Sequence, residues 1–111
     1  MRKIVLSVSQ SMQSRSERDA FLAQAGGFAV APALSIESAL QKIETLPFCA
    51  VILGPSLSLE EKHRFMSAVR GRKHFSVISI RRNGEVGSGA DLEIESQDDD
   101  KLLRAIHALA A

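Results

Sequence analysis

Residues 49–57 read CAVILGPSL, an apolar run that ends in a Gly-Pro turn. A strand with apolar residues at every position is typical of burial on both faces, because a half-exposed strand alternates apolar with polar residues. Residues 49–53 therefore predict a central strand of a parallel sheet. Gly54 then stands at the carboxyl end of that strand, the edge at which open α/β sheets bind their ligands. Glycine brings no side chain to this edge.

Elsewhere in the chain, short apolar runs alternate with segments of helical spacing. Strands are predicted over residues 4–8, 28–34, 49–53, 75–80 and 90–96, and helices over 14–25, 35–46, 58–69 and 98–110. Alternating strands and helices favour a parallel sheet with helices on both faces. The chain is expected to form a single domain over residues 1–111, an ordinary domain length.

Local patterns indicate where two helices begin and where one strand lies. Ser58 and Glu61 have the spacing of a capping box, in which two side chains satisfy N–H groups at a helix start. Ser35 is expected to cap the preceding helix. Pro32 has no N–H to donate to a neighbouring strand, so its strand should lie at an edge of the sheet.

Residues 81–91, RRNGEVGSGAD, break the alternation. They are rich in glycine and have no apolar periodicity, so we expect a loop where a further helix would lie. Eleven extended residues reach about 36 Å, which suffices to return the chain for another parallel strand. Asn83-Gly84 is also a hairpin signal, so an antiparallel last strand is the competing topology.

Composition argues against several classes of protein. With 14 Lys and Arg against 13 Asp and Glu, the net charge of +1 generates no long-range field for nucleic acid or anionic lipid. There is no Tyr or Trp to stack on bases. No run approaches the ~20 apolar residues of a membrane span, and the single cysteine, Cys49, cannot form an internal disulfide. We expect a cytoplasmic protein without a membrane partner.

The basic residues form two separate groups. RGRKH at 70–74 precedes a strand and lies at the amino-terminal side of the sheet, whereas Arg81 and Arg82 follow that strand and lie at the opposite end. Such divided charge argues against a nucleic-acid surface. Arg81 and Arg82 could hold an acidic peptide or a phosphate, or remain solvated.

No set of catalytic or metal-binding residues can be assembled from the sequence. His63, His74 and His107 share no ligand spacing, and Cys49 begins a strand far from its carboxyl end. Asp98–Asp100 stand at a helix start, where the helix dipole stabilises carboxylates without a metal. We therefore expect no enzyme activity, no metal and no cofactor.

Four segments give the chain a family resemblance: KIVLSVSQ at 3–10, ALSIESALQKI at 33–43, CAVILGPSLS at 49–58 and GAD at 89–91. With these segments the chain resembles the receiver domain of two-component response regulators. The resemblance implies a flavodoxin-like three-layer sandwich with a five-stranded parallel sheet in the order 2-1-3-4-5. Four helices are expected, because the family's fourth helix is replaced by the glycine-rich loop.

The family's chemistry implies an aspartate that accepts a phosphoryl group with the help of magnesium. The position that matches this aspartate is Gly54, and Ser9 and Gln10 occupy the places of the acidic pair after the first strand. The family's switch Thr or Ser matches Arg81, and its lysine falls near Ser96. None of these residues supplies the acceptor or the anionic oxygens that magnesium prefers. The resemblance therefore implies a degenerate pocket without phosphotransfer.

Loss of the fourth helix is expected to leave apolar sheet surface open beside Val77, Ile80 and Leu92, and such surface usually becomes an interface. Arg82 and Val86, in the loop, would border it. Alternatively, the loop itself folds over the gap with Val86.

Two functions of different classes fit these observations. The leading hypothesis is an atypical, phosphorylation-independent pseudo-receiver that acts as a protein–protein interaction module in two-component-type signal transduction. It would bind a partner protein or itself, as a homodimer through the edge of the fourth and fifth strands. The alternative is a flavodoxin-like protein that binds a small molecule, phosphate or nucleotide at the carboxyl ends of the strands.

Overall fold

The computed structural model describes residues 4–9, 20, 24, 28–45, 47–69, 75–81, 89–95 and 99–110. The strands are β1 (Ile4–Val8), β2 (Ala29–Ala33), β3 (Phe48–Leu53), β4 (Ser76–Arg81) and β5 (Leu92–Glu95). The helices are α2 (Ile36–Thr45), α3 (Leu59–Val69) and α4 (Asp99–Ala110). Ala20 and Gln24 are also helical, as predicted, and the rest of the predicted first helix lies outside the described residues.

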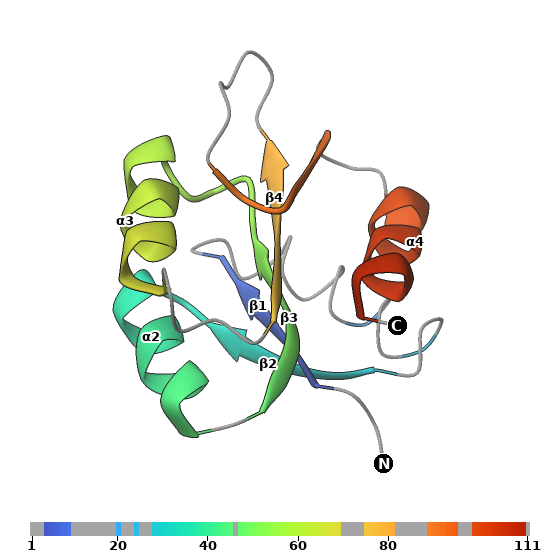
Figure 1. The fold of residues 1–111 in the computed structure, drawn as a ribbon, viewed down its shortest axis with the longest axis horizontal. Helices are drawn as coiled ribbons and strands as arrows, with labels where there is room; N and C mark the ends of the chain where they lie inside the picture. The colour runs from blue at the N-terminus through green and yellow to red at the C-terminus, as the bar shows by residue number, and fades with distance from the viewer. Residues whose placement is uncertain are drawn as a thin grey trace.

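The five strands form one parallel sheet in the order β2-β1-β3-β4-β5. Val5 of β1 is in register with Val30 of β2 on one side and with Ala50 of β3 on the other. α2 and α3 lie on one face of the sheet and α4 lies on the other (Figure 1). The predicted three-layer fold and strand order are confirmed, and the parallel pairing of β5 with β4 excludes the antiparallel alternative.

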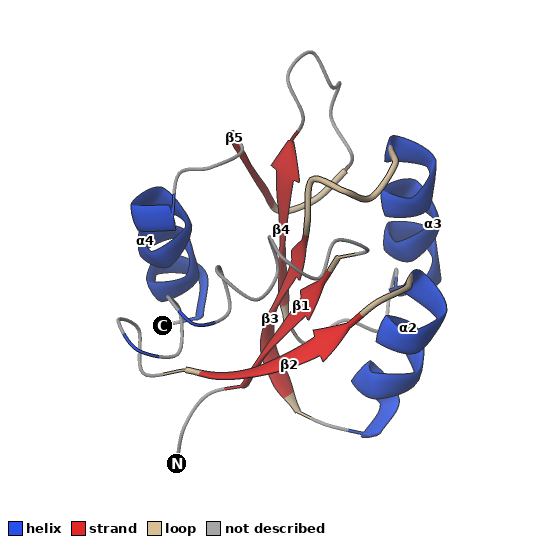
Figure 2. Ribbon diagram, turned by 180° about the vertical axis from the view of Figure 1, so that it is seen from behind, coloured by secondary structure: helices blue, strands red, loops and turns tan. Residues whose placement is uncertain are grey.

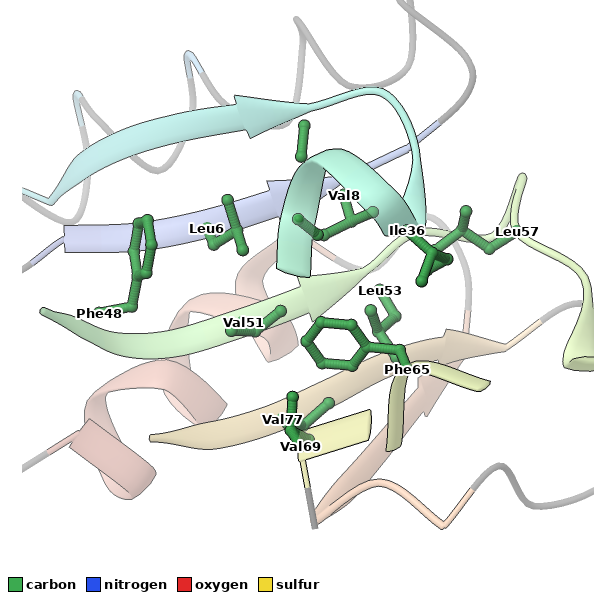
Figure 3. Packing of buried hydrophobic residues seen from close by; sticks show 12 residues of the cluster. Leu6, Val8, Ile36, Phe48, Val51, Leu53, Leu57, Phe65, Val69 and Val77 are labelled. Atoms are coloured by element: carbon green, nitrogen blue, oxygen red, sulfur yellow. The ribbon is translucent and has the colours of Figure 1, made fainter. Parts of the chain in front are cut away.

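β3 is buried on both faces, as its sequence predicts. Val51 and Leu53 pack with Leu6, Val8 and residues of α2 and α3. Figure 3 shows the Phe65 ring of α3 lying against Leu53. Ala50 and Ile52 point to the other face, into the cluster beneath α4. Full burial of one valine, leucine or isoleucine side chain stabilises the fold by about 1.5–3 kcal/mol.

The second cluster joins α4 to the centre and one edge of the sheet. Ile78 and Ile80 of β4 and Ile94 of β5 pack with α4 residues on its apolar stripe, Leu102 and Ile106. At the far end of α4, the ring of exposed His107 lies 5.2 Å from the ring of Phe28. The side chains of Asp98–Asp100 lie outside the described residues, so their predicted role at the helix start stays a prediction.

β2 lies at an edge of the sheet, as Pro32 predicts (Figure 2). The carbonyl of Ala33 accepts a hydrogen bond from the N–H of Ser9 at 3.0 Å. The backbone polar groups of Ala33 therefore point toward β1, and the carbonyl of Pro32 points away from the sheet. The Lys42 ammonium donates to the Pro32 carbonyl at 2.5 Å. A missing N–H and an occupied carbonyl leave this stretch of edge poorly suited to pairing with another strand.

β5 is placed by the residues that precede it. Gly89 has a φ of 86°, a left-handed conformation that glycine adopts without a steric penalty. Asp91 Oδ2 accepts a hydrogen bond from the Val77 N–H at 2.7 Å, one residue before the register of β4 with β5 begins at Ile78 and Leu92. The Asp91 side chain thus accepts from an N–H of β4 that lies before the first residue pair of β4 and β5. Residues 82–88, which carry most of the predicted loop, lie outside the described residues.

The predicted helix caps of α2 and α3 are present. Ser58 Oγ accepts from the Glu61 N–H at 3.1 Å, and Glu61 Oε1 accepts from the Ser58 N–H at 3.0 Å. These reciprocal bonds form the capping box of α3. Ser35 Oγ accepts from the Ser38 N–H at 3.0 Å and caps α2.

The α3 cap yields a prediction for stability. Ser58→Ala removes one side of the capping box and should lower the free energy of unfolding by about 1 kcal/mol, measured by urea denaturation. Ser67→Ala is the matched control, because Ser67 is exposed in the middle of the same helix. The control should leave stability within about 0.5 kcal/mol of the wild type. Equal losses in the two variants would contradict a special role for Ser58.

An ion pair between Glu37 of α2 and Arg64 of α3 gives a second prediction, for pH. A hydrogen bond to its own backbone N–H, and then Arg64, hold the pKa of Glu37 below the usual 4.5. Because the folded state favours the carboxylate, the stabilisation is present above the unfolded pKa and is lost as pH falls through the folded pKa, below 4.5.

An NMR titration of the Glu37 carboxyl carbon measures this effect. Arg64→Met should raise the midpoint only part of the way to its usual value, since the hydrogen bond to the backbone N–H, the largest single cause of the lowering, remains in the variant. A midpoint that does not move in Arg64→Met would contradict the contribution of the ion pair.

Candidate functional site

Three of the residues predicted for the degenerate pocket come together at the carboxyl edge of the sheet. Ser9 follows β1, Gly54 follows β3 and Arg81 is the last residue of β4. Because β1, β3 and β4 are parallel neighbours, their carboxyl ends meet at the same edge. Gln10 and Ser96 lie outside the described residues.

Gly54 closes a tight turn at the centre of this edge. Its N–H donates to the Val8 carbonyl at 2.8 Å, which ties the ends of β1 and β3 together. Its carbonyl accepts from the Leu57 N–H at 3.2 Å, so Pro55 stands at the second position of a four-residue turn, which suits its fixed φ. Gly54 is buried, and both of its backbone polar groups are bonded within the protein.

Ser9 links three parts of the edge. Its N–H donates to Ala33 of β2, and its hydroxyl forms a 2.9 Å hydrogen bond with the hydroxyl of Ser56 in the loop after β3. Ser9 has no exposed surface. Hydroxyl groups lack the anionic oxygens that magnesium favours. Among the described residues, no three His, Cys, Asp or Glu side chains are grouped so that they could hold a metal ion.

Lys62 is a residue of this region that sequence reasoning missed. It lies one turn inside α3 and has no exposed surface. Its ammonium donates to the carbonyl of Ile80 at 2.9 Å. The register of β3 with β4 ends at Leu53 and Ser79, so this carbonyl lies beyond the last paired residue of β3. Its spacing could have indicated its burial, because Lys62 lies three and seven residues before the buried Phe65 and Val69, on the same side of the helix.

Ser79 lies beside this contact on the same face of the sheet. Val77, two residues earlier, packs in the α2–α3 cluster, so alternation directs Ser79 and Arg81 to that face as well. Ser79 has no exposed surface, and its hydroxyl has no hydrogen-bond partner. Glu93 of β5 is its register partner, and both Arg81 and Glu93 are partly exposed.

The two faces of the β4–β5 edge therefore differ in polarity. Toward α3 it presents Ser79, Arg81 and Glu93, and toward α4 it presents Ile80 and Ile94. A helix packs on a sheet through apolar side chains. At the β4–β5 edge, the side toward α4 offers such side chains, and the side toward α3 does not.

The predicted open apolar surface is corrected for two residues. Val77 has no exposed surface because it lies under α3, and Ile80 is only 5% exposed because it lies under α4. Leu92 is 38% exposed, as expected of that surface. Arg82 and Val86 lie outside the described residues, so their predicted part in an interface stays a prediction.

The remaining candidates lie away from the carboxyl edge or outside the described residues. His63 is exposed on α3, and His74 falls, with the other residues of 70–74, outside the described part of the chain. Cys49 is half-buried near the start of β3 and packs against the α4-side cluster. None of the described helices is long and apolar enough to cross a bilayer.

Comparison with known proteins identifies the fold. Neither a known family nor a curated protein matches the sequence. Among solved structures, the chain is similar to chemotaxis protein CheY4 of Vibrio cholerae, with a TM-score of 0.82, 20% identity, and coverage of 98% of this chain and 99% of that one. It is also similar to a CheY-like response regulator receiver domain protein from Methanospirillum hungatei, with a TM-score of 0.78, 19% identity and coverage of 99% and 94%.

A response regulator receiver protein from Pseudomonas putida is similar over 97% of this chain and 98% of its own, with a TM-score of 0.81 and 17% identity. Identities this low relate backbones and carry no residue roles. The chain has the receiver, or CheY-like, fold.

Proposed function

We propose that this chain is a phosphorylation-independent receiver-like module, which acts through protein contacts in two-component-type signal transduction and is not an enzyme. The receiver fold supports the signalling context, because the similar structures are described as response regulators or receiver domains. The loss of phosphotransfer is inferred from the residues at the carboxyl edge of the sheet.

The observation that carries the proposal is the state of Gly54. It follows the central strand, at the position that the family resemblance assigns to the phosphoacceptor aspartate. Its N–H is bonded to Val8 and its carbonyl to Leu57, so this position is occupied by the backbone of a closed turn. The neighbouring Ser9 hydroxyl is bonded to Ser56. Neither residue offers a carboxylate to a phosphoryl donor or to magnesium.

Protein contact then becomes the remaining way to transmit a signal. Leu92 is a large apolar residue that is 38% exposed, and it lies on β5, at the edge of the sheet opposite β2. We propose that this edge contacts a partner protein or a second copy of the chain. Arg82 and Val86, next to β4 in sequence, would extend the contact.

Phosphodonor treatment tests the loss of phosphotransfer. After incubation with acetyl phosphate and magnesium, mass spectrometry of the intact protein should detect no added phosphoryl group, because no carboxylate stands at Gly54. Beryllofluoride with magnesium should leave the amide NMR spectrum unchanged. A receiver domain that retains its aspartate serves as the positive control under the same conditions. An aspartyl phosphate located by mass spectrometry on this chain would overturn the proposal.

Self-association through the β5 edge is tested with two matched leucine variants. Leu92→Arg should weaken dimerisation by at least about tenfold, because a charged side chain would be desolvated in the contact. Leu34→Arg is the control, since Leu34 is 49% exposed and follows β2 at the opposite edge. Light scattering over a range of concentrations gives the dissociation constants. A wild-type chain that stays monomeric, or equal effects of both variants, would contradict a dimer through β5.

A further inference from the structure

Edge strand β2 has the composition of a strand that pairs readily with another chain. Ala29–Ala33 carries no charged side chain, and Leu34, which follows it, is 49% exposed. An apolar edge strand offers its backbone N–H and C=O groups to a second strand, and proteins usually protect such edges with charge or with proline. Within the described part of the chain, two features protect β2: Pro32 lacks an N–H, and the Lys42 ammonium of α2 is bonded to the Pro32 carbonyl.

The backbone groups on the outer side of β2 follow from its bonds to β1. The Ala33 carbonyl accepts from the Ser9 N–H, so the polar groups of Ala33 point toward β1, and this direction alternates along a strand. The backbone groups of Val30 and Pro32 therefore point outward. They are the Val30 N–H, the Val30 carbonyl and the Pro32 carbonyl. Lys42 is bonded to the last of these three groups at 2.5 Å.

We propose that Lys42 keeps β2 from pairing with a second copy of this chain, and that removal of its ammonium turns β2 into a dimer interface. In an antiparallel pair of β2 strands with a twofold axis at Ala31, Val30 of each copy lies opposite Pro32 of the other. Each Val30 N–H then donates to the Pro32 carbonyl of the other copy. That carbonyl is the acceptor to which Lys42 is bonded.

The Lys42 ammonium opposes this pairing in two ways. It competes with the Val30 N–H of the other copy for the Pro32 carbonyl, and its charge would be desolvated between two strands that lie about 4.8 Å apart. If the bond between Lys42 and Pro32 served only to fasten α2 to β2, its loss would lower stability without changing self-association. The inference concerns the edge opposite β5 and does not depend on the proposed signalling role.

Lys42→Met tests the inference, because methionine keeps an unbranched apolar stem and a high helix propensity but has no ammonium. Light scattering over a range of concentrations should show self-association at least about tenfold tighter than that of the wild-type chain. Loss of one hydrogen bond from a charged group accounts for a factor of this size, and a wild-type dimer would have to break one in each copy. Lys42→Ala should give the same increase, since alanine favours the helix even more. Unchanged or weaker self-association in either variant would refute the inference.

Lys101→Met is the matched control. It removes the same charge from an exposed position on α4, away from β2, and should associate as the wild type does. An equal increase in Lys101→Met would assign the effect to net charge and would contradict a specific role for Lys42.

Two further measurements locate the contact in the Lys42→Met chain. The Val30 amide hydrogen should exchange more slowly as the protein concentration rises, because it becomes bonded in the dimer. An added Leu34→Arg should reverse the gain in association, since Leu34 lies opposite Phe28 of the other copy at the end of the paired strands. An added Leu92→Arg should leave the gain in place. Unchanged exchange at Val30, or a gain that Leu34→Arg does not reverse, would show aggregation or another contact and would overturn the inference.

Discussion

Burial of β3 on both faces is the constraint on which the rest of the structure depends. Val51 and Leu53 need a cover on one side, and Ala50 and Ile52 need one on the other. A single sheet with a helix layer on each face satisfies both requirements. β3 then lies at the centre of the sheet, so the residue that follows it, Gly54, lies at the centre of the carboxyl edge. The position of the candidate site is thus a consequence of where the apolar residues must go.

The chemistry of this edge follows from residues that satisfy one another. A cluster of carboxylates at the ends of β1 and β3 would repel itself and would need a cation to be stable. Ser9, Gly54 and Ser56 carry no charge and bond to their neighbours directly. Each such hydrogen bond contributes about 0.5–1.5 kcal/mol and fixes a loop without an ion. These bonds join neutral groups, so they do not depend on the protonation of a carboxylate.

The sequence predicts the elements whose signals are local. The cap of α3 depends on two side chains three residues apart, and the edge position of β2 depends on the missing N–H of Pro32, so both are readable without knowledge of distant contacts. The grouping of Val77 with Ile80 in one surface was wrong for a local reason too. Residues three apart on a strand point to opposite faces, so these two side chains lie under different helices.

The burial of Lys62 could not be predicted with the same ease. A lysine beside an apolar stripe usually extends its ammonium into solvent, and only the neighbouring strand shows whether an acceptor is within reach. Here the end of β3 leaves the Ile80 carbonyl available to it. The acceptor belongs to a residue eighteen positions away, and its availability depends on the register of two strands. Such contacts are products of the tertiary structure.

The polar face of the β4–β5 edge agrees with the glycine-rich composition of residues 81–91. A helix over this face would have to bury Ser79, Arg81 and Glu93, at a cost that its own packing would need to offset. The polar side chains of these strands and the glycine-rich composition of residues 81–91 therefore both disfavour a helix over this face. Such agreement between local sequence and tertiary packing is expected of a natural sequence. A contact through this face would be governed by charge and would weaken as salt screens it, whereas a contact through Leu92 would be governed by apolar burial. The dependence of an interaction on ionic strength thus distinguishes which of the two surfaces mediates it.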